Sequence, residues 1–149
     1  MRKIFICIAF SFLGLASALA QESFKTDSVF NWHPRSQVTM SVVKGKELKA
    51  YNLDYFKSIR FKATDEETAH VLRWLEDDSA TAIDDEKVST DGHLVYRLMR
   101  FSGQKPSIYQ YIGFQQKRID GEAYLTVVYM RGEATPDDLN KIFKHRKVK

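Results

Sequence analysis

The sequence predicts an α+β domain, with a mostly antiparallel sheet of about five to six strands and about two to three helices packed on one face. Three features of the sequence favour this class. Several short runs alternate apolar and polar residues, two segments have capped helical starts, and the turns between the last runs are short. Short turns join antiparallel neighbours, and a helix with one apolar stripe must bury that stripe on another layer.

The first 20 residues, MRKIFICIAFSFLGLASALA, have the three parts of a secretory signal peptide. The start is positively charged, residues 4–15 are apolar, and residues 18–20 form a small-residue cleavage site. A transmembrane anchor is the alternative, but it needs roughly 20 apolar residues. We therefore expect cleavage between Ala20 and Gln21, export to the periplasm or the exterior, and no transmembrane anchor.

The rest of the chain is expected to form one domain. Removal of 20 of the 149 residues leaves 129, and we predict a lead-in segment over residues 21–35 and a single α+β domain over residues 36–149. Cys7 is the only cysteine and lies in the signal peptide, so no disulfide is expected. Two of the 23 basic residues and none of the 19 acidic residues lie there too, which leaves 21 minus 19, a net charge of +2. A nearly balanced exported chain is not expected to bind nucleic acid.

The first half of the domain predicts a strand, a short helix and a connector. Residues 38–43 alternate and predict the strand, residues 46–52 predict the helix, and Leu53 and Phe56 predict a buried connector. The lead-in is too apolar to be a solvated linker, and we expect it to pack on the domain as a turn of helix or an edge strand. Its apolar residues are Phe24, Val29, Phe30 and Trp32.

The clearest predicted strand is followed directly by the clearest predicted helix. Residues 58–63 alternate with period two, which is typical of a strand with one solvated face. Thr64 and Glu67 match a capping box, in which the Thr64 hydroxyl accepts from the Glu67 amide and the Glu67 carboxylate accepts from the Thr64 amide. The helix is predicted to run to about Asp78 because apolar positions recur at helical spacing. These positions are Thr68, Val71, Leu72 and Leu75.

The second half predicts antiparallel strands and a last helix. Asp91-Gly92 and Asp120-Gly121 are hairpin signals. A helix is expected after Thr135 as N-cap, with Pro136 at its first position. The predicted strands cover roughly residues 86–90, 94–101, 108–116 and 123–130. The buried side of the last helix is expected to consist of Leu139, Ile142 and Phe143.

Residues 124–139, YLTVVYMRGEATPDDL, resemble the end of a family of small exported domains of unknown function from Gram-negative gut bacteria and their relatives. The similarity extends back through the capped helix at Thr64 and the strand at Val38. Such relatives are commonly lipoproteins, and this chain differs from them because it has no cysteine after its signal peptide. The resemblance implies a soluble envelope or secreted protein, and it supplies no catalytic residues.

The aromatic residues of the predicted sheet suggest a binding surface. Both faces of the last strands are partly apolar, so one face packs on the helices and the other must be covered by the lead-in, a partner or a ligand. Tyrosine beside basic residues suits a carbohydrate or an anionic envelope polymer. The simpler alternative is that tyrosine is common in strands. The candidate binding residues are Tyr109, Tyr111, Tyr124, Arg60, Lys62 and Arg97.

Other chemistry finds little support. The acidic cluster from Asp77 to Glu86 leaves an irregular calcium loop open as an alternative to a solvated loop, although an EF-hand register from Asp77 places Ala82 where glycine is required. No GxSxG motif surrounds a serine, and the histidines lack zinc-ligand spacing. The sequence therefore predicts no catalytic residue, metal or cofactor. The histidines are His33, His70, His93 and His145.

Together these observations predict a non-enzymatic exported domain that binds an envelope protein or an envelope polysaccharide. Two alternatives remain open, a hydrolase with a noncontiguous site and a structural or regulatory envelope subunit. Self-association through an exposed sheet face is a further alternative, because an uncovered apolar face favours association.

Overall fold

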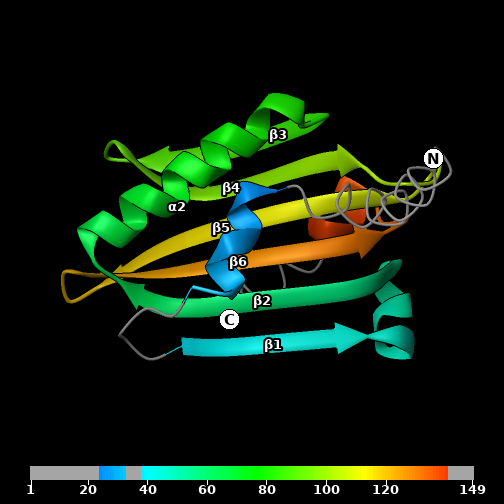
Figure 1. Ribbon diagram of the computed structural model, residues 1–149, viewed down its shortest axis with the longest axis horizontal. Helices are drawn as coiled ribbons and strands as arrows, with labels where there is room; N and C mark the ends of the chain where they lie inside the picture. The colour runs from blue at the N-terminus through cyan, green and yellow to red at the C-terminus, as the bar shows by residue number, and fades with distance from the viewer. Residues whose placement is uncertain (1–23, 33–37, 141–149) are drawn as a thin grey trace, which may run out of the picture.

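A computed structural model shows an open six-stranded sheet in which every pair of neighbours is antiparallel (Figure 1). The structure describes residues 24–32 and 38–140. The strands are β1 (Val38–Lys44), β2 (Leu53–Ala63), β3 (Asp84–Thr90), β4 (His93–Ser102), β5 (Tyr109–Ile119) and β6 (Glu122–Gly132). Their order across the sheet is β1-β2-β6-β5-β4-β3, so β1 and β3 form the two edges. The predicted antiparallel sheet is therefore confirmed, in a fold that is mostly β with some helix.

The helical segments are short and lie on both faces of the sheet (Figure 1). Residues 136–140 start a further helix after β6, as predicted from Thr135 and Pro136. The predicted signal peptide, Ile142 and Phe143 lie outside the described residues. The other helical segments are η1 (Lys25–Phe30), η2 (Gly45–Tyr51), α2 (Asp65–Asp78) and η3 (Ser79–Thr81).

The first face of the sheet is covered by α2 and η1, and we call it the helix face. Val71 and Leu75 of α2 and Val29 of η1 are all fully buried there. The described part of the lead-in, residues 24–32, therefore contains a helical turn, the first of its two predicted alternatives, and it helps to cover the same face as α2. The strand residues beneath are Ile59, Phe61, Ala63, Met99, Phe101, Ile112, Phe114, Leu125 and Val127.

The second face has a core of its own, and we call it the far face. Leu48 of η2 and Ala134 and Leu139 after β6 pack against it. The prediction that the helices pack on one face is therefore wrong. The physical reason is that the central strands are apolar on both sides, so each face needs a cover. The strand residues of this core are Leu53, Leu98, Tyr111, Val128 and Met130.

Local signals in the sequence are reproduced closely. The Thr64 amide donates to the Glu67 carboxylate at 2.9 Å, and the Glu67 amide donates to the Thr64 hydroxyl at 3.1 Å, which confirms the capping box. Asp91-Gly92 and Asp120-Gly121 have positive φ at both residues and join β3 to β4 and β5 to β6. Positive φ at both central residues is typical of the two-residue hairpin turn whose backbone twist matches that of the flanking strands.

The predicted connector at Leu53 and Phe56 is wrong, because both residues belong to β2. Leu53 pairs with Gly132 and Phe56 pairs with Met130 of β6. The irregular register between Leu53 and Tyr55 breaks the alternation that sequence patterns rely on. No helix among the described residues is long and apolar enough to cross a membrane.

Candidate functional site

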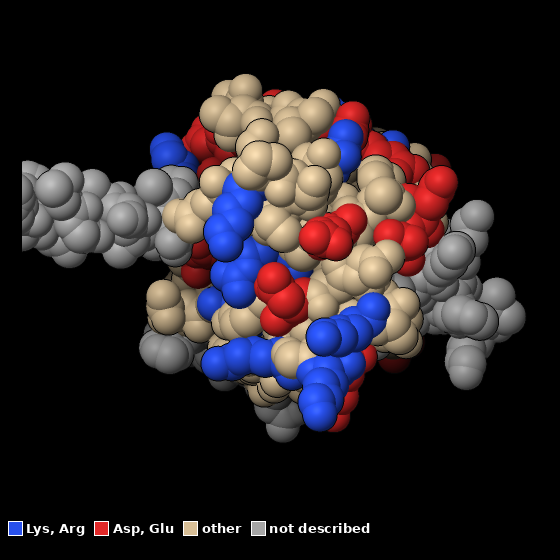
Figure 2. All heavy atoms as spheres, turned by 90° about the vertical axis from the view of Figure 1, so that its right-hand side faces the viewer, with Lys and Arg blue, Asp and Glu red and all other residues tan. Residues whose placement is uncertain are grey.

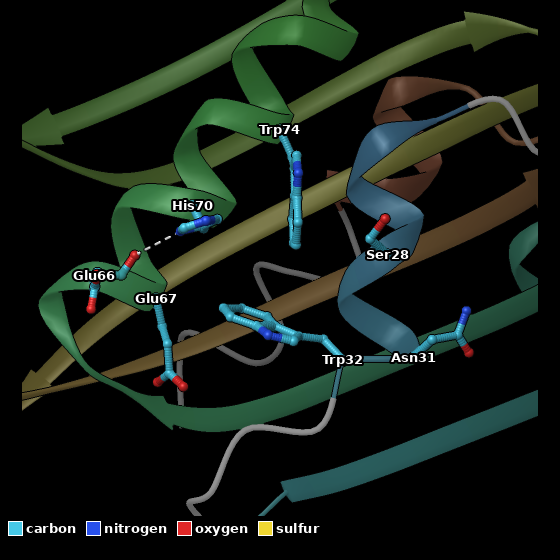
Figure 3. A pocket seen from close by; sticks show the side chains of 7 residues that line it. All are labelled: Ser28, Asn31, Trp32, Glu66, Glu67, His70 and Trp74. Atoms are coloured by element: carbon cyan, nitrogen blue, oxygen red, sulfur yellow. Dashed lines mark hydrogen bonds between the residues drawn. The ribbon is translucent and has the colours of Figure 1, made fainter.

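An open cleft lined by aromatic and polar side chains lies between η1 and α2 on the helix face (Figure 3). The rings of Trp32 and Trp74 meet edge to face, with centroids 5.4 Å apart and planes at 76°. The ring centroid of His70 lies 6.1 Å from that of Trp32 and 6.0 Å from that of Trp74. The cleft has a volume of about 630 Å³, and we call it the tryptophan cleft. Its lining residues are Ser28, Asn31, Trp32, Glu66, Glu67, His70 and Trp74.

One wall of the tryptophan cleft is a stripe on the first half of α2. Glu66, His70 and Trp74 follow one another at intervals of four residues, so they lie on one side of the helix. Nδ1 of His70 lies 3.3 Å from the carbonyl oxygen of Glu66. This stripe borders the buried stripe of Val71 and Leu75, which holds the helix on the sheet. The polar and aromatic side of α2 is therefore turned toward η1.

The other wall is held in place by a buried carboxylate at the end of α2. Asp78 accepts hydrogen bonds from the Lys25 amide at 2.8 Å, the Thr26 amide at 2.8 Å and the Thr26 hydroxyl at 2.6 Å. Carboxylate hydrogen bonds of this kind are among the stronger ones in proteins. Val29 fills the core one turn later, and Trp32 follows at the mouth of the tryptophan cleft. Asp78 therefore positions Trp32 without lining the cleft itself.

The lining combines flat apolar rings with hydrogen-bonding groups. Trp32 and Trp74 are the only two tryptophans of the chain, and both are partly exposed. The indole faces favour flat apolar partners, while the Ser28 hydroxyl, the Asn31 amide and the Glu66 carboxylate are donors or acceptors. A ligand with an apolar face and a polar rim matches this lining.

The structure divides the six predicted binding residues into separate groups. Arg97 lies on the helix face, opposite the tyrosines, because it pairs with Phe114 on β5. Its buried guanidinium donates to Asp85 at 2.6 and 2.9 Å and to Glu76 at 3.2 Å. The hydrogen bond to Asp85 raises the pKa of Arg97, and the same bond lowers the pKa of Asp85. Arg97 of β4 therefore links α2 and β3 to its own strand through ion pairs. It does not lie beside the predicted tyrosine surface.

Tyr111 and Tyr109 both lie on the far face, but neither forms an open surface. Tyr111 is fully buried, and its hydroxyl donates to the Ala134 carbonyl at 2.5 Å. Burial raises the pKa of Tyr111 to about 12. The Arg100 guanidinium lies 4.6 Å from the centroid of the half-buried Tyr109 ring. The segment after β6 thus covers the part of the far face that Tyr111 occupies.

Tyr124, Arg60 and Lys62 are the predicted residues that the structure does bring together. Lys62 pairs with Tyr124 across β2 and β6, and the Arg60 guanidinium lies 5.8 Å from the Tyr124 ring centroid. The Lys62 ammonium forms an ion pair with Glu122 at 2.7 Å. This trio lies on the far face, away from the tryptophan cleft.

The acidic cluster at and after the end of α2 makes hydrogen bonds and ion pairs within the fold. Asp78 holds η1, Asp77 lies 3.4 Å from the Lys25 ammonium, and Asp84 lies 2.5 Å from the Arg100 guanidinium. Within residues 24–32 and 38–140, no group of three or more His, Cys, Asp or Glu residues is arranged to hold a metal ion. These contacts give Asp77, Asp78 and Asp84 a structural role in the fold.

Basic and acidic side chains lie close together at the end of the sheet where η2 lies. Figure 2 shows Lys and Arg side chains over the middle and lower parts of this end, with Asp and Glu side chains among and beside them. Lys46 and Lys49 of η2 and Lys44 at the end of β1 are exposed. This end of the molecule is a mixed surface and not a concentrated basic patch.

Sequence patterns alone do not predict the tryptophan cleft. The sequence places Trp32 in an apolar lead-in and offers His70 only as a potential zinc ligand. The available signal is the spacing of four residues between Glu66, His70 and Trp74. In a helix that begins after the Thr64 cap, this spacing places the three side chains on one side. That signal says nothing about Trp32, which comes from a different element.

Residues 13–143 match a family described as a family of unknown function, DUF6108. The chain belongs to the DUF6108 family. The membership confirms a family without an assigned activity, as the resemblance of residues 124–139 implied. No curated protein matches the chain. The function of this DUF6108 domain must therefore be argued from the chemistry of its own surface.

Proposed function

We propose that the chain is an exported, non-enzymatic domain that binds a glycan in the tryptophan cleft. The observation that carries this proposal is that both tryptophans, Trp32 and Trp74, line one open cleft together with polar side chains. The predicted signal peptide supports it, because export delivers the domain to compartments where polysaccharides are exposed.

Saccharide chemistry fits the lining of the tryptophan cleft. A pyranose ring has an apolar face of C–H groups and a rim of hydroxyls. The indole faces of Trp32 and Trp74 suit the C–H face, and the Asn31 amide can donate to or accept from the hydroxyls. Glu66 and Glu67 also line the cleft, so a neutral saccharide or an N-acetylated amino sugar suits it better than an anionic polymer.

The test is a titration of the protein, purified after expression of the full chain, with neutral hexose and N-acetylhexosamine oligosaccharides. Because both tryptophans line the cleft, a shift in tryptophan emission reports on this site, whereas titration calorimetry measures binding anywhere on the protein. We expect Trp74→Ala to weaken binding by about tenfold or more, from the lost ring contact. Tyr124→Ala removes an aromatic ring from the far face and is the matched control.

Two results would overturn the proposal. One is that no saccharide of either class binds to the folded protein. The other is that Tyr124→Ala abolishes binding while Trp74→Ala does not, which would place the ligand on the far face.

The non-enzymatic part of the proposal needs a separate test. Glu66 and Glu67 both line the cleft, and the Glu67 carboxylate already accepts the Thr64 amide as part of the capping box. After long incubation of the protein with each oligosaccharide that binds, mass spectrometry should show that the length of the oligosaccharide is unchanged. Shortened products that disappear in Glu66→Gln would show a hydrolase instead.

A further inference from the structure

The edge strand β1 presents an exposed row of apolar side chains along one edge of the described sheet. Among the described residues β1 pairs with β2 alone, and no strand lies along its other side (Figure 1). Met40 is 46% exposed and Val42 is 49% exposed. Met40 pairs with Ile59 of β2, so this row continues the helix face of the sheet. A regular strand edge with unpaired backbone groups is a template for another strand.

The opposite edge strand, β3, is protected in the way that exposed edges usually are. All seven of its residues are exposed, and it begins with the acidic run of residues 84–86. Asp84 and Asp85 form ion pairs with Arg100 and Arg97 of the neighbouring strand. β1 carries only one charged residue, Lys44, at its last position. Charged side chains discourage edge pairing, so the two edges differ in what they permit.

We infer that β1 pairs with β1 of a second copy of the chain, antiparallel and centred on Ser41. This register uses all seven residues of the strand. It places Met40 opposite Val42, Thr39 opposite Val43, and Ser41 opposite itself. Apolar residues on the helix face then meet apolar residues, which is the favourable cross-strand arrangement. Lys44 lies opposite Val38, so the two lysines are at opposite ends of the pairing.

Symmetry supports this register over its neighbours. A two-fold axis between antiparallel strands stands perpendicular to the sheet, so the helix face of one copy continues as the helix face of the other. A symmetric register must therefore pair residues of the same face, and among such registers only the one centred on Ser41 uses the whole strand. The result is a closed dimer with a continuous twelve-stranded sheet, from six strands in each copy.

The dimer has a consequence for the cleft, although the pairing itself does not depend on the glycan proposal. Both tryptophan clefts lie on the helix face, so the dimer presents them on the same side of one sheet. Two sites on one side allow simultaneous contact with a repeating polymer, which raises the apparent affinity without new contacts.

The first test is sedimentation velocity of the protein purified after expression of the full chain. We expect a dimer at micromolar concentration. Met40→Lys with Val42→Lys places lysines opposite each other and should raise the dimer dissociation constant by about tenfold or more. Val88→Lys with Thr90→Lys on β3 is the matched control and should leave the dimer intact. Circular dichroism spectra that match the wild type show that both variants are folded.

The second test is a cross-link that the proposed axis allows. Ser41→Cys places two thiols opposite each other, and a bridge of this geometry needs Cα atoms within about 7 Å. Mild oxidation should convert Ser41→Cys to a covalent dimer, whereas Ser89→Cys on β3 should stay uncross-linked. A monomer at high micromolar concentration would overturn the inference and leave β1 to a strand of a different protein. Open-ended oligomers would also overturn it, because they indicate pairing of β1 with β3.

Discussion

The hydroxyl of Thr26 donates a hydrogen bond of 2.6 Å to the carboxylate of Asp78, at the end of α2. The amide of Thr26 donates to the same carboxylate oxygen at 2.8 Å, and both groups are buried. These bonds connect the segment before the sheet to a helix 52 residues further along the chain. They fix the distance between the two walls of the tryptophan cleft, and so the stability of this contact and the shape of the cleft are linked.

Asp78→Ala is expected to destabilise the fold by about 3 kcal/mol, because the part-buried amide of Lys25 and the buried amide and hydroxyl of Thr26 lose a charged acceptor. Tryptophan emission should shift to longer wavelength as Trp32 becomes more exposed to water. Urea unfolding gives the first quantity and fluorescence of the native state gives the second. Asp77→Ala is the neighbouring control, since Asp77 makes only an exposed ion pair, and should cost less than about 1 kcal/mol. Equal effects of the two variants would contradict this role of Asp78.

Stability should fall in acid through Asp85. The hydrogen bond from Arg97 lowers the pKa of Asp85 below its ordinary value of 3.8. The stabilisation is therefore complete above the unfolded pKa and is lost as pH falls from about that value through the lower folded one. We expect the free energy of unfolding of the wild type to exceed that of Asp85→Asn at pH 6, and the difference to shrink below pH 3.8. Urea unfolding across this range measures it, and a constant difference would contradict the coupling.

Tyr111→Phe should cost about 1 to 2 kcal/mol, because the buried Ala134 carbonyl loses its hydrogen bond. Burial raises the pKa of Tyr111 from 10 to about 12, so between these values the unfolded chain releases this proton first and the wild type loses stability. The difference in free energy of unfolding between the wild type and Tyr111→Phe should therefore decrease from pH 8 to pH 11. Tyr124→Phe is the control on a half-exposed ring, and a loss as large as that of Tyr111→Phe would contradict the argument.

Gly132→Ala should destabilise the fold by at least about 2 kcal/mol, because an added Cβ collides with backbone. That atom would lie 2.6 Å from the Asn52 carbonyl oxygen and 2.6 Å from the Cα of Leu53, neither of which can turn aside. Gly113→Ala is the matched control in the neighbouring strand, where the nearest atom to an added Cβ is 3.7 Å away on Val128. Thermal unfolding should show a lower Tm for Gly132→Ala and little change for Gly113→Ala.

The features that could be predicted from sequence depend on residues close together in the chain. The capping box of Thr64 and Glu67 spans one helical turn, and the turns at Asp91-Gly92 and Asp120-Gly121 are set by two residues each. Such signals act through local sterics and local hydrogen bonds, so they survive in almost any tertiary context. The faces of Tyr109 and Tyr111 were predictable for the same reason, since strand alternation is local.

The errors concern relations between elements. Sequence patterns group Arg97 with the tyrosines because they give the two faces of each strand but do not show which face continues into the same face of a neighbouring strand. The pairing of β4 with β5 places Arg97 opposite Phe114, and this register assigns Arg97 to the helix face. The cover of the far face by Ala134 and Leu139 could not be predicted either, because it requires the chain to turn after β6.

Most of the strands, the capped helix, the hairpin turns and the apolar character of both sheet faces could be predicted from the sequence, since each follows from neighbours within a few positions. The first part of β2, the contact of Trp32 with Trp74, the burial of Arg97 in ion pairs and the place of β1 at an edge became visible in the folded structure. Those outcomes depend on long-range packing, in which the whole set of apolar surfaces is buried together and no single segment carries the information.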